Sequence, residues 1–149
     1  MLVKDVMTPS PQCCKPTDTL DRVAALMLEH DCGVIPVCKA TKLEGIITDR
    51  DITCRSVATC KIPSVVPVSN VMTKTVYTIR QDDDVQAAIE LMEAKQVRRL
   101  PVLNDKNDVV GIVAPSDLAP TFASTDVADF LLAVSYWTRR PAVGNQPPA

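Results

Sequence analysis

Two segments carry apolar residues at the three- and four-residue spacing of an amphipathic helix. The apolar positions are Leu20, Val23, Ala24, Met27 and Leu28 in the first segment and Val85, Ala88, Ile89 and Met92 in the second. This spacing predicts two helices whose apolar faces pack against a core. Asp18 and Asp83 precede them at the expected N-cap positions.

Short apolar runs follow each predicted helix and are bounded by polar turn residues. We interpret residues 34–38, 43–47, 99–103 and 109–113 as strands on this pattern. Residues 11–15 and 76–80, ahead of the helices, are expected to be further strands. Additional helices are expected to begin near Asp49 and Pro115. The order is β-α-β-β-α, and it occurs twice.

The two series are copies of one unit. Residues 5–8 (DVMT) match residues 70–73 (NVMT), and Gly45-Ile46-Ile47 matches Gly111-Ile112-Val113. The sequence predicts an α+β fold of two repeats, residues 1–60 and 61–120. Each repeat is too short for a substantial core of its own, so we expect the two to pack together with pseudo-two-fold symmetry.

The C-terminal segment lies outside the repeat. Residues 121–138 are expected to form a segment that contains one helix, and Ser124 or Thr125 can cap that helix. Its apolar stripe is Val127, Phe130, Leu131 and Val134. Tyr136 and Trp137 lie near its expected end, and residues 139–149 are predicted to be a disordered tail. The helix either covers the repeats or mediates self-association, and the sequence leaves both open.

Composition and charge exclude several classes of protein. The 149 residues carry a formal net charge of -2 and a pI of about 5.3, which gives no basic surface for nucleic acid. No apolar run approaches the ~20 residues of a membrane span. No apolar signal-peptide region follows Met1. We therefore expect a cytoplasmic protein that binds neither nucleic acid nor membrane.

Catalytic and metal chemistry have little support in the sequence. The six cysteines lack C-x-x-C spacing and there is one histidine, so no metal site is expected. Four glycines leave no glycine-rich phosphate loop, so no enzyme is predicted. A thiol sensor based on Cys13 and Cys14 is a weaker interpretation, because no neighbour in the sequence clearly lowers a thiol pKa.

The stretch from Gly45 to Ile52 joins a predicted strand to a predicted helix. Thr48 and Asp51 fit a capping box, which alone is the commoner role of such a pair. The same stretch also suits a nucleotide. Unpaired N–H groups at a helix start can bind phosphate, and a carboxylate can accept hydrogen bonds from two ribose hydroxyls.

Four motifs, in their order along the chain, resemble the cystathionine-β-synthase (CBS) domain. They are V-M-T, a helix ending in L-M, G-x-x-P-V and G-I-I-T-D-R-D-I, and the resemblance covers residues 2–120. It implies a CBS pair, or Bateman module: a regulatory signal-transduction module that binds AMP, ADP or ATP. S-adenosylmethionine or a dinucleotide is the less expected ligand. The resemblance also implies homodimers and a site in the cleft between the repeats.

Carried over residue by residue, the resemblance implies one principal ligand site. Its residues are Ile46, Ile47, Thr48, Arg50, Asp51, Thr73, Tyr77, Arg98 and Arg99. Asp51 would hold the ribose diol, and Thr48 would face a phosphate or the ribose. Arg98 or Arg99 would pair with phosphate oxygens. Ile46, Ile47 and Tyr77 would contact the adenine.

A second, weaker site is implied in the other copy. Its residues are Thr8, Gln12, Gly33, Val34, Ser116 and Asp117. Ala114 and Pro115 replace the hydroxyl and an N–H donor there, while Gly33 and Val34 stand where the other copy has two arginines. We expect one competent site and one degenerate site. The alternative is a ligand-free dimeric scaffold with vestigial clefts, which binds a partner protein.

Overall fold

The computed structural model describes residues 1–122 and 126–135, which form two compact units. The first-copy unit holds residues 11–76 and 107–109. The second-copy unit holds residues 1–10, 77–106, 110–122 and 126–135. The opening residues of each repeat therefore belong to the unit of the other repeat. The two units are defined by contacts between residues and not by the sequence repeat. The repeat boundaries at residues 60 and 120 therefore stay predictions.

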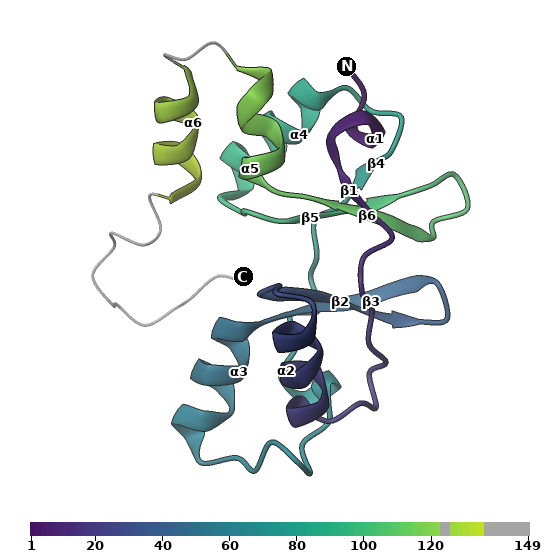
Figure 1. The fold of residues 1–149 in the computed structure, drawn as a ribbon, viewed down its shortest axis with the longest axis vertical. Helices are drawn as coiled ribbons and strands as arrows, with labels where there is room; N and C mark the ends of the chain where they lie inside the picture. The colour runs from purple at the N-terminus through teal and green to yellow at the C-terminus, as the bar shows by residue number, and fades with distance from the viewer. Residues whose placement is uncertain (123–125, 136–149) are drawn as a thin grey trace. The chain divides into compact units, whose positions relative to one another are not determined.

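The first-copy unit is a β-hairpin covered on one face by two helices (Figure 1). Strands β2 (Val34–Lys39) and β3 (Lys42–Thr48) pair antiparallel, with Ile35 opposite Ile47. Helices α2 (Leu20–Glu29) and α3 (Asp49–Arg55) lie on that face, and short 3-10 turns η1 (Val57–Thr59) and η2 (Val68–Asn70) follow. The core includes Leu20, Val23, Ile35, Val37, Ile47, Val68 and Val71.

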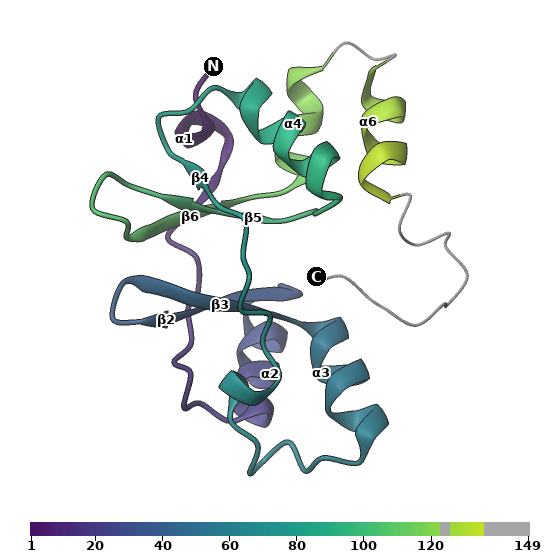
Figure 2. The same cartoon turned by 180° about the vertical axis from the view of Figure 1, so that it is seen from behind.

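The second-copy unit contains a four-stranded sheet in the order β1-β6-β5-β4. The strands are β1 (Thr8–Pro9), β4 (Ile79–Arg80), β5 (Leu100–Leu103) and β6 (Val109–Val113). Helices α4 (Val85–Lys95), α5 (Pro115–Leu118) and α6 (Asp126–Ser135) lie on one side of this sheet (Figures 1 and 2). A short helix α1 (Val3–Val6) precedes β1, and a 3-10 turn η3 (Ala119–Thr121) follows α5.

Helix α6 packs on the second-copy unit. Phe130 and Val134 are buried in its core beside residues of α4, and the Phe130 ring stacks on Phe122 with centroids 4.9 Å apart. The predicted C-terminal helix is therefore confirmed and covers this unit, but Leu131 of its predicted stripe is 42% exposed. Its expected caps at residues 124 and 125, its expected end at residues 136–138, and the tail at 139–149 lie outside the described residues.

In each unit, the β3 or β6 strand is completed by the V-M-T segment that opens the other repeat. Thr73 and Ile46 exchange two backbone hydrogen bonds of 2.9 Å, and Thr8 pairs with Ile112 in the same antiparallel sense. A backbone pair contributes about 1 kcal/mol net. The larger consequence is geometric, because the V-M-T segment fixes what can lie beside β3 and β6.

The α+β repeat architecture is confirmed, with four local corrections. The strand expected at residues 76–80 is only Ile79–Arg80. Thr19 and Asp84 are the N-caps of α2 and α4, whereas Asp18 and Asp83 accept hydrogen bonds from the N–H groups of Lys15 and Arg80. Ala24 and Leu28 are exposed, Leu28 to 85%, so the buried stripe of α2 is narrower than predicted. The strand expected at residues 11–15 is a single bridge between Cys14 and Val37.

Candidate functional site

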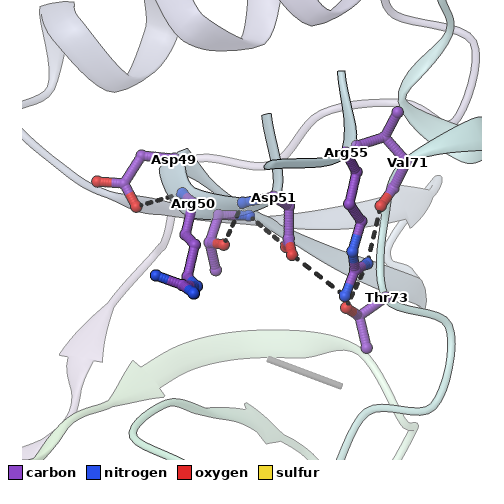
Figure 3. Close-up of polar contacts among 7 residues, drawn as sticks. Asp49, Arg50, Asp51, Arg55, Val71 and Thr73 are labelled. Carbon is purple, nitrogen blue, oxygen red and sulfur yellow. Dashed lines mark hydrogen bonds and ion pairs between the residues drawn. The ribbon is translucent and has the colours of Figure 1, made fainter. Parts of the chain in front are cut away.

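The junction of β3 and α3 is a complete capping box. Thr48 ends the strand and caps the helix, and its N–H donates to Asp51 Oδ2 at 3.0 Å. The Asp51 N–H donates in return to Thr48 Oγ1 at 3.1 Å (Figure 3). The pairing satisfies two N–H groups that a helix start otherwise leaves without partners. The structural role predicted for this pair is therefore confirmed.

The other N–H groups at this helix start are also occupied. The Asp49 N–H donates to the Gly33 carbonyl at 3.1 Å, and the Arg50 N–H donates to the Asp49 carboxylate at 2.8 Å. The expectation of unpaired N–H groups that bind a phosphate here is wrong for this conformation of the chain. Charged side chains are left as the groups that could bind a phosphate at this junction.

Arg55 completes the site and was not predicted from the sequence. Its Nη2 lies 3.4 Å from Asp51 Oδ1, one helical turn away. Its Nη1 donates to the Val71 carbonyl at 3.0 Å and to Thr73 Oγ1 at 3.1 Å (Figure 3). Arg55 therefore joins α3 to the V-M-T segment. The only sequence indication was the four-residue spacing of Asp51 and Arg55, which places both on one helix face.

Burial of the Asp51 carboxylate makes its contacts with Arg55 and Thr48 necessary for its charge. Asp51 is 3% exposed, while the Arg55 side chain is 37% exposed. A buried carboxylate is stable in its charged form only with a cation and hydrogen-bond donors around it. Asp51 has both, in Arg55 and the Thr48 N–H. Thr73, 4% exposed, is held by the same arginine.

The remaining predicted residues of the first-copy unit differ in exposure. Ile46 is buried and pairs with Thr73, whereas the Ile47 side chain is part of the core. Arg50 is exposed, and its side chain extends away from Arg55 in Figure 3. Within the residues that the structure describes, the Arg50 guanidinium makes no ion pair. The structure thus brings Ile46, Thr48, Asp51 and Thr73 together.

Tyr77, Arg98 and Arg99 belong to the second-copy unit. Lys95 Nζ lies 5.3 Å from the centre of the Tyr77 ring, at cation–π distance. Both arginines are exposed and precede β5, which begins at Leu100. The strand predicted to begin at residue 99 therefore begins one residue later. Arg99 donates to the Arg98 carbonyl at 2.7 Å.

The corresponding junction in the second copy lacks most of this chemistry. The Ala114 N–H still donates to Asp117 Oδ2, at 2.8 Å, but Ala114 has no hydroxyl to return the bond. Thr121 stands where the first copy has Arg55, and its hydroxyl donates to the Leu118 carbonyl. Asp117 is only half-buried. The copies therefore differ by a cation as well as by the predicted hydroxyl.

The other residues predicted for the weaker site are spread over both units. Thr8 and Ser116 are exposed in the second-copy unit, and Gln12 and Gly33 are exposed in the first-copy unit. Val34 begins β2 and is half-buried. Thr8 is the counterpart of Thr73, but it is exposed, whereas Thr73 is 4% exposed and accepts a hydrogen bond from Arg55.

The sequence of the two units matches a known family. The family model for the CBS domain matches residues 3–57 and again residues 68–123. The chain belongs to the CBS domain family. The two matches coincide with the two copies found from the internal repeat, so the predicted resemblance is confirmed.

Individual CBS proteins cover most of the chain. YhcV, a CBS domain-containing protein of Bacillus subtilis (strain 168), is 39% identical over 126 residues, which span 85% of this chain and 89% of YhcV. The crystal structure of Hypoxic Response Protein I, with two coordinated zinc ions, superposes with a TM-score of 0.74 at 31% identity. It covers 83% of this chain and 100% of its own.

A third similar protein carries bound ligands. The CBS domain pair of protein MJ0100 was solved in complex with 5'-methylthioadenosine and S-adenosyl-L-methionine. Its TM-score is 0.73 at 28% identity, over 83% of this chain and 100% of that one. In the described part of the present CBS pair, no helix is long and apolar enough to cross a membrane, and no three potential metal ligands cluster.

Proposed function

We propose that this CBS pair is a regulatory module that binds an adenine nucleotide, and that Asp51 binds the ribose. The buried Asp51 carboxylate is the observation on which the proposal rests. Each carboxylate oxygen has about two acceptor positions. Oδ2 has accepted one N–H and Oδ1 lies beside one guanidinium, so both oxygens retain capacity for ribose hydroxyls. The MJ0100 pair, with two adenosyl ligands, supports this class of ligand.

Arg50 favours a phosphate on that ligand, and the CBS resemblance adds Arg98 and Arg99 as proposed phosphate ligands. Arg50 is exposed beside Asp51 in sequence and makes no ion pair among the described residues. Arg98 and Arg99 are exposed in the second-copy unit. Guanidinium pairs with phosphate oxygens in a planar, permanently charged geometry. Because the helix-start N–H groups are occupied, these side chains are the proposed phosphate ligands. AMP, ADP or ATP should therefore bind more tightly than adenosine.

Thermal unfolding of the full chain with a panel of adenosyl compounds tests the proposal. At 100 times Kd a ligand adds about 2.7 kcal/mol of stability, which for a chain of this size raises Tm by roughly 5–10 °C. Asp51→Asn keeps the shape of the side chain and one oxygen for the Thr48 N–H. We expect it to abolish the shift.

Asp117→Asn is the matched control, because Asp117 occupies the same place in the second copy. It should leave the nucleotide shift within about 1 °C of the parent, since Ala114 and Thr121 leave that copy without a hydroxyl or cation. A shift that survives Asp51→Asn and disappears in Asp117→Asn would place the ligand at the other copy and contradict the proposal.

Calorimetric titration should find one nucleotide per chain. Arg98→Gln combined with Arg99→Gln should weaken ATP binding at least tenfold, since a hydrogen bond to a charged group contributes about 1.5–3 kcal/mol. Adenosine binding should change less than threefold. Two equal sites per chain, or equal losses for ATP and adenosine, would contradict the assigned roles.

We further propose that the module acts as a cytoplasmic homodimer whose packing changes with nucleotide. Large apolar side chains are exposed in the first-copy unit, including Leu28, Ile62 and Val65. Such side chains mark protein contacts when they are grouped. Light scattering with and without ATP should give twice the mass of one chain. A Leu28→Asp variant that stays dimeric would remove Leu28 from that contact.

A ligand-free scaffold is the second candidate, and one observation favours it. The Thr48 hydroxyl and both Asp51 oxygens already have partners within the chain. The capping box and the Asp51–Arg55 ion pair give Thr48, Asp51 and Arg55 a structural role that needs no nucleotide. The same thermal panel separates the two functions, because a scaffold predicts no shift with any adenosyl compound.

A further inference from the structure

Arg55 makes more contacts than a counter-ion for Asp51 needs. Its Nη1 donates to the Val71 carbonyl at 3.0 Å and to Thr73 Oγ1 at 3.1 Å, so the V-M-T segment takes both hydrogens of that nitrogen (Figure 3). The guanidinium group is planar and rigid. Two bonds at one nitrogen therefore fix the plane of the whole group, and with it the position of Nη2 beside Asp51.

The two acceptors that hold Arg55 are themselves fixed in the first-copy unit. Thr73 exchanges two backbone hydrogen bonds of 2.9 Å with Ile46 of β3, and its side chain is buried. Val71 belongs to the core of this unit. Arg55 is thus anchored on buried, paired backbone outside α3. The position of its Nη2 is set by the V-M-T segment as well as by the helix that carries Asp51.

The contact between Arg55 and Asp51 stabilises charge without using up the acceptor. Nη2 lies 3.4 Å from Oδ1, whereas a charge-assisted N–H···O bond is about 2.7–2.9 Å long. A cation at the longer distance still supports a carboxylate that is 3% exposed. Oδ2 accepts the Thr48 N–H at 3.0 Å. The carboxylate is therefore held at Oδ2 by the helix cap and kept charged, with acceptor capacity left, at Oδ1.

The second copy has the first of these supports and lacks the second. Asp117 Oδ2 accepts the Ala114 N–H at 2.8 Å, as Asp51 Oδ2 accepts the Thr48 N–H. Thr121 stands at the position of Arg55 and donates to the Leu118 carbonyl. No ion pair to Asp117 is found in the described parts of the chain. The helix cap is common to both copies, and the anchored cation is what the first copy adds.

We propose that Arg55 is a positioning residue for the nucleotide. Anchored on Val71 and Thr73, it keeps Asp51 charged and holds Oδ1 ready for a ribose hydroxyl, and it does not contact the ligand itself. The inference rests on the proposed binding of an adenine nucleotide and adds a residue that acts through Asp51. A hydroxyl donates more strongly to a charged acceptor than to a neutral one. Ribose recognition thereby depends on the V-M-T segment as well as on α3.

Calorimetric titration of Arg55→Met with AMP, adenosine and 2'-deoxyadenosine tests this role. The affinities for AMP and adenosine should fall by the same factor, at least about tenfold, because both ligands use the same ribose hydroxyls. The parent chain should prefer adenosine to 2'-deoxyadenosine by at least about tenfold, and the variant by less than about threefold. The titrations are made where circular dichroism shows the variant folded, so a loss of stability alone does not change this preference.

Two further variants complete the comparison. Arg22→Met removes an exposed arginine from the same i,i+4 type of pair, and it should leave all three affinities within about twofold of the parent. Arg55→Lys keeps a positive charge, but one ammonium nitrogen does not reproduce the planar fork of the guanidinium. It should weaken AMP and adenosine binding by one common factor, smaller than that of Arg55→Met. If Arg55→Met does not fold, this variant decides.

The possible results separate three roles of Arg55. A loss for AMP alone would make Arg55 a phosphate ligand, and parental affinities in the folded variants would make its role purely structural. Either result overturns the positioning role while the proposed function stands. If the parent chain binds none of the three compounds, the proposed function itself fails, and the positioning role of Arg55 fails with it.

Discussion

Replacing Arg55 with methionine should destabilise the chain by about 2–3 kcal/mol. Methionine keeps most of the apolar stem, so the change removes the charge and its donors. Asp51 then stays buried at 3% exposure without its cation, and Thr73 and the Val71 carbonyl each lose a donor. Loss of one partner from a fully buried pair costs ~3–5 kcal/mol, and the 37% exposure of the Arg55 side chain reduces that figure.

Arg22→Met is the matched control for this prediction. Arg22 forms the same i,i+4 type of pair with Asp18, but at 3.9 Å and with its side chain 72% exposed. Its loss should cost no more than about 0.5 kcal/mol. Urea unfolding of both variants measures the difference. Equal midpoints would mean that the Arg55 contacts contribute no more than a surface ion pair.

The repeat made most of the fold predictable. Two copies of one apolar pattern specify the same elements twice, so an ambiguous segment in one copy is resolved by its counterpart. The stripe Val85, Ala88, Ile89 and Met92 is buried as predicted. The strand at residues 109–113 was predicted with the bounds that the structure has. Hydrophobic periodicity is sufficient for such elements, because it reports directly which face is buried.

Local choices among similar residues were less predictable. Asp82, Asp83 and Asp84 are consecutive, and any of them could cap α4 on propensity alone. Asp84 does so, because Asp83 accepts the Arg80 N–H and Asp82 pairs with Lys4. Lys4 is distant in the sequence. Tertiary contacts of this kind decide which of several equivalent residues becomes the cap.

The candidate site shows the same limit. The capping box of Thr48 and Asp51 is local, and its spacing predicted it. Arg55 was missed because two of its three partners, Val71 and Thr73, lie in the V-M-T segment of the other repeat. The expectation of free N–H groups failed because the Gly33 carbonyl, also distant in sequence, occupies one of them. Contacts across long sequence separations leave no spacing pattern to read.

The glycine that precedes Ile46 is required by the segment that passes beside it. A β-carbon on Gly45 would lie 2.9 Å from the Thr73 carbonyl oxygen and 2.6 Å from Met72 Sδ. The sulfur can move, but the carbonyl is fixed by the paired 2.9 Å hydrogen bonds of Thr73 and Ile46. Gly111 meets the Thr8 carbonyl oxygen and the Met7 sulfur in the same way. The two glycines therefore follow from the two V-M-T segments.

Gly45→Ala should accordingly destabilise the chain by about 2–3 kcal/mol, since an added methyl must displace backbone in a packed contact. Gly33→Ala is the control, because the added carbon would meet the exposed, flexible Asp49 carboxylate at 2.9 Å and no backbone. It should change stability by no more than about 0.5 kcal/mol. Urea midpoints give both values. If Gly45→Ala is as stable as Gly33→Ala, the V-M-T segment can shift away from β3, and its pairing with Ile46 contributes little to the fold.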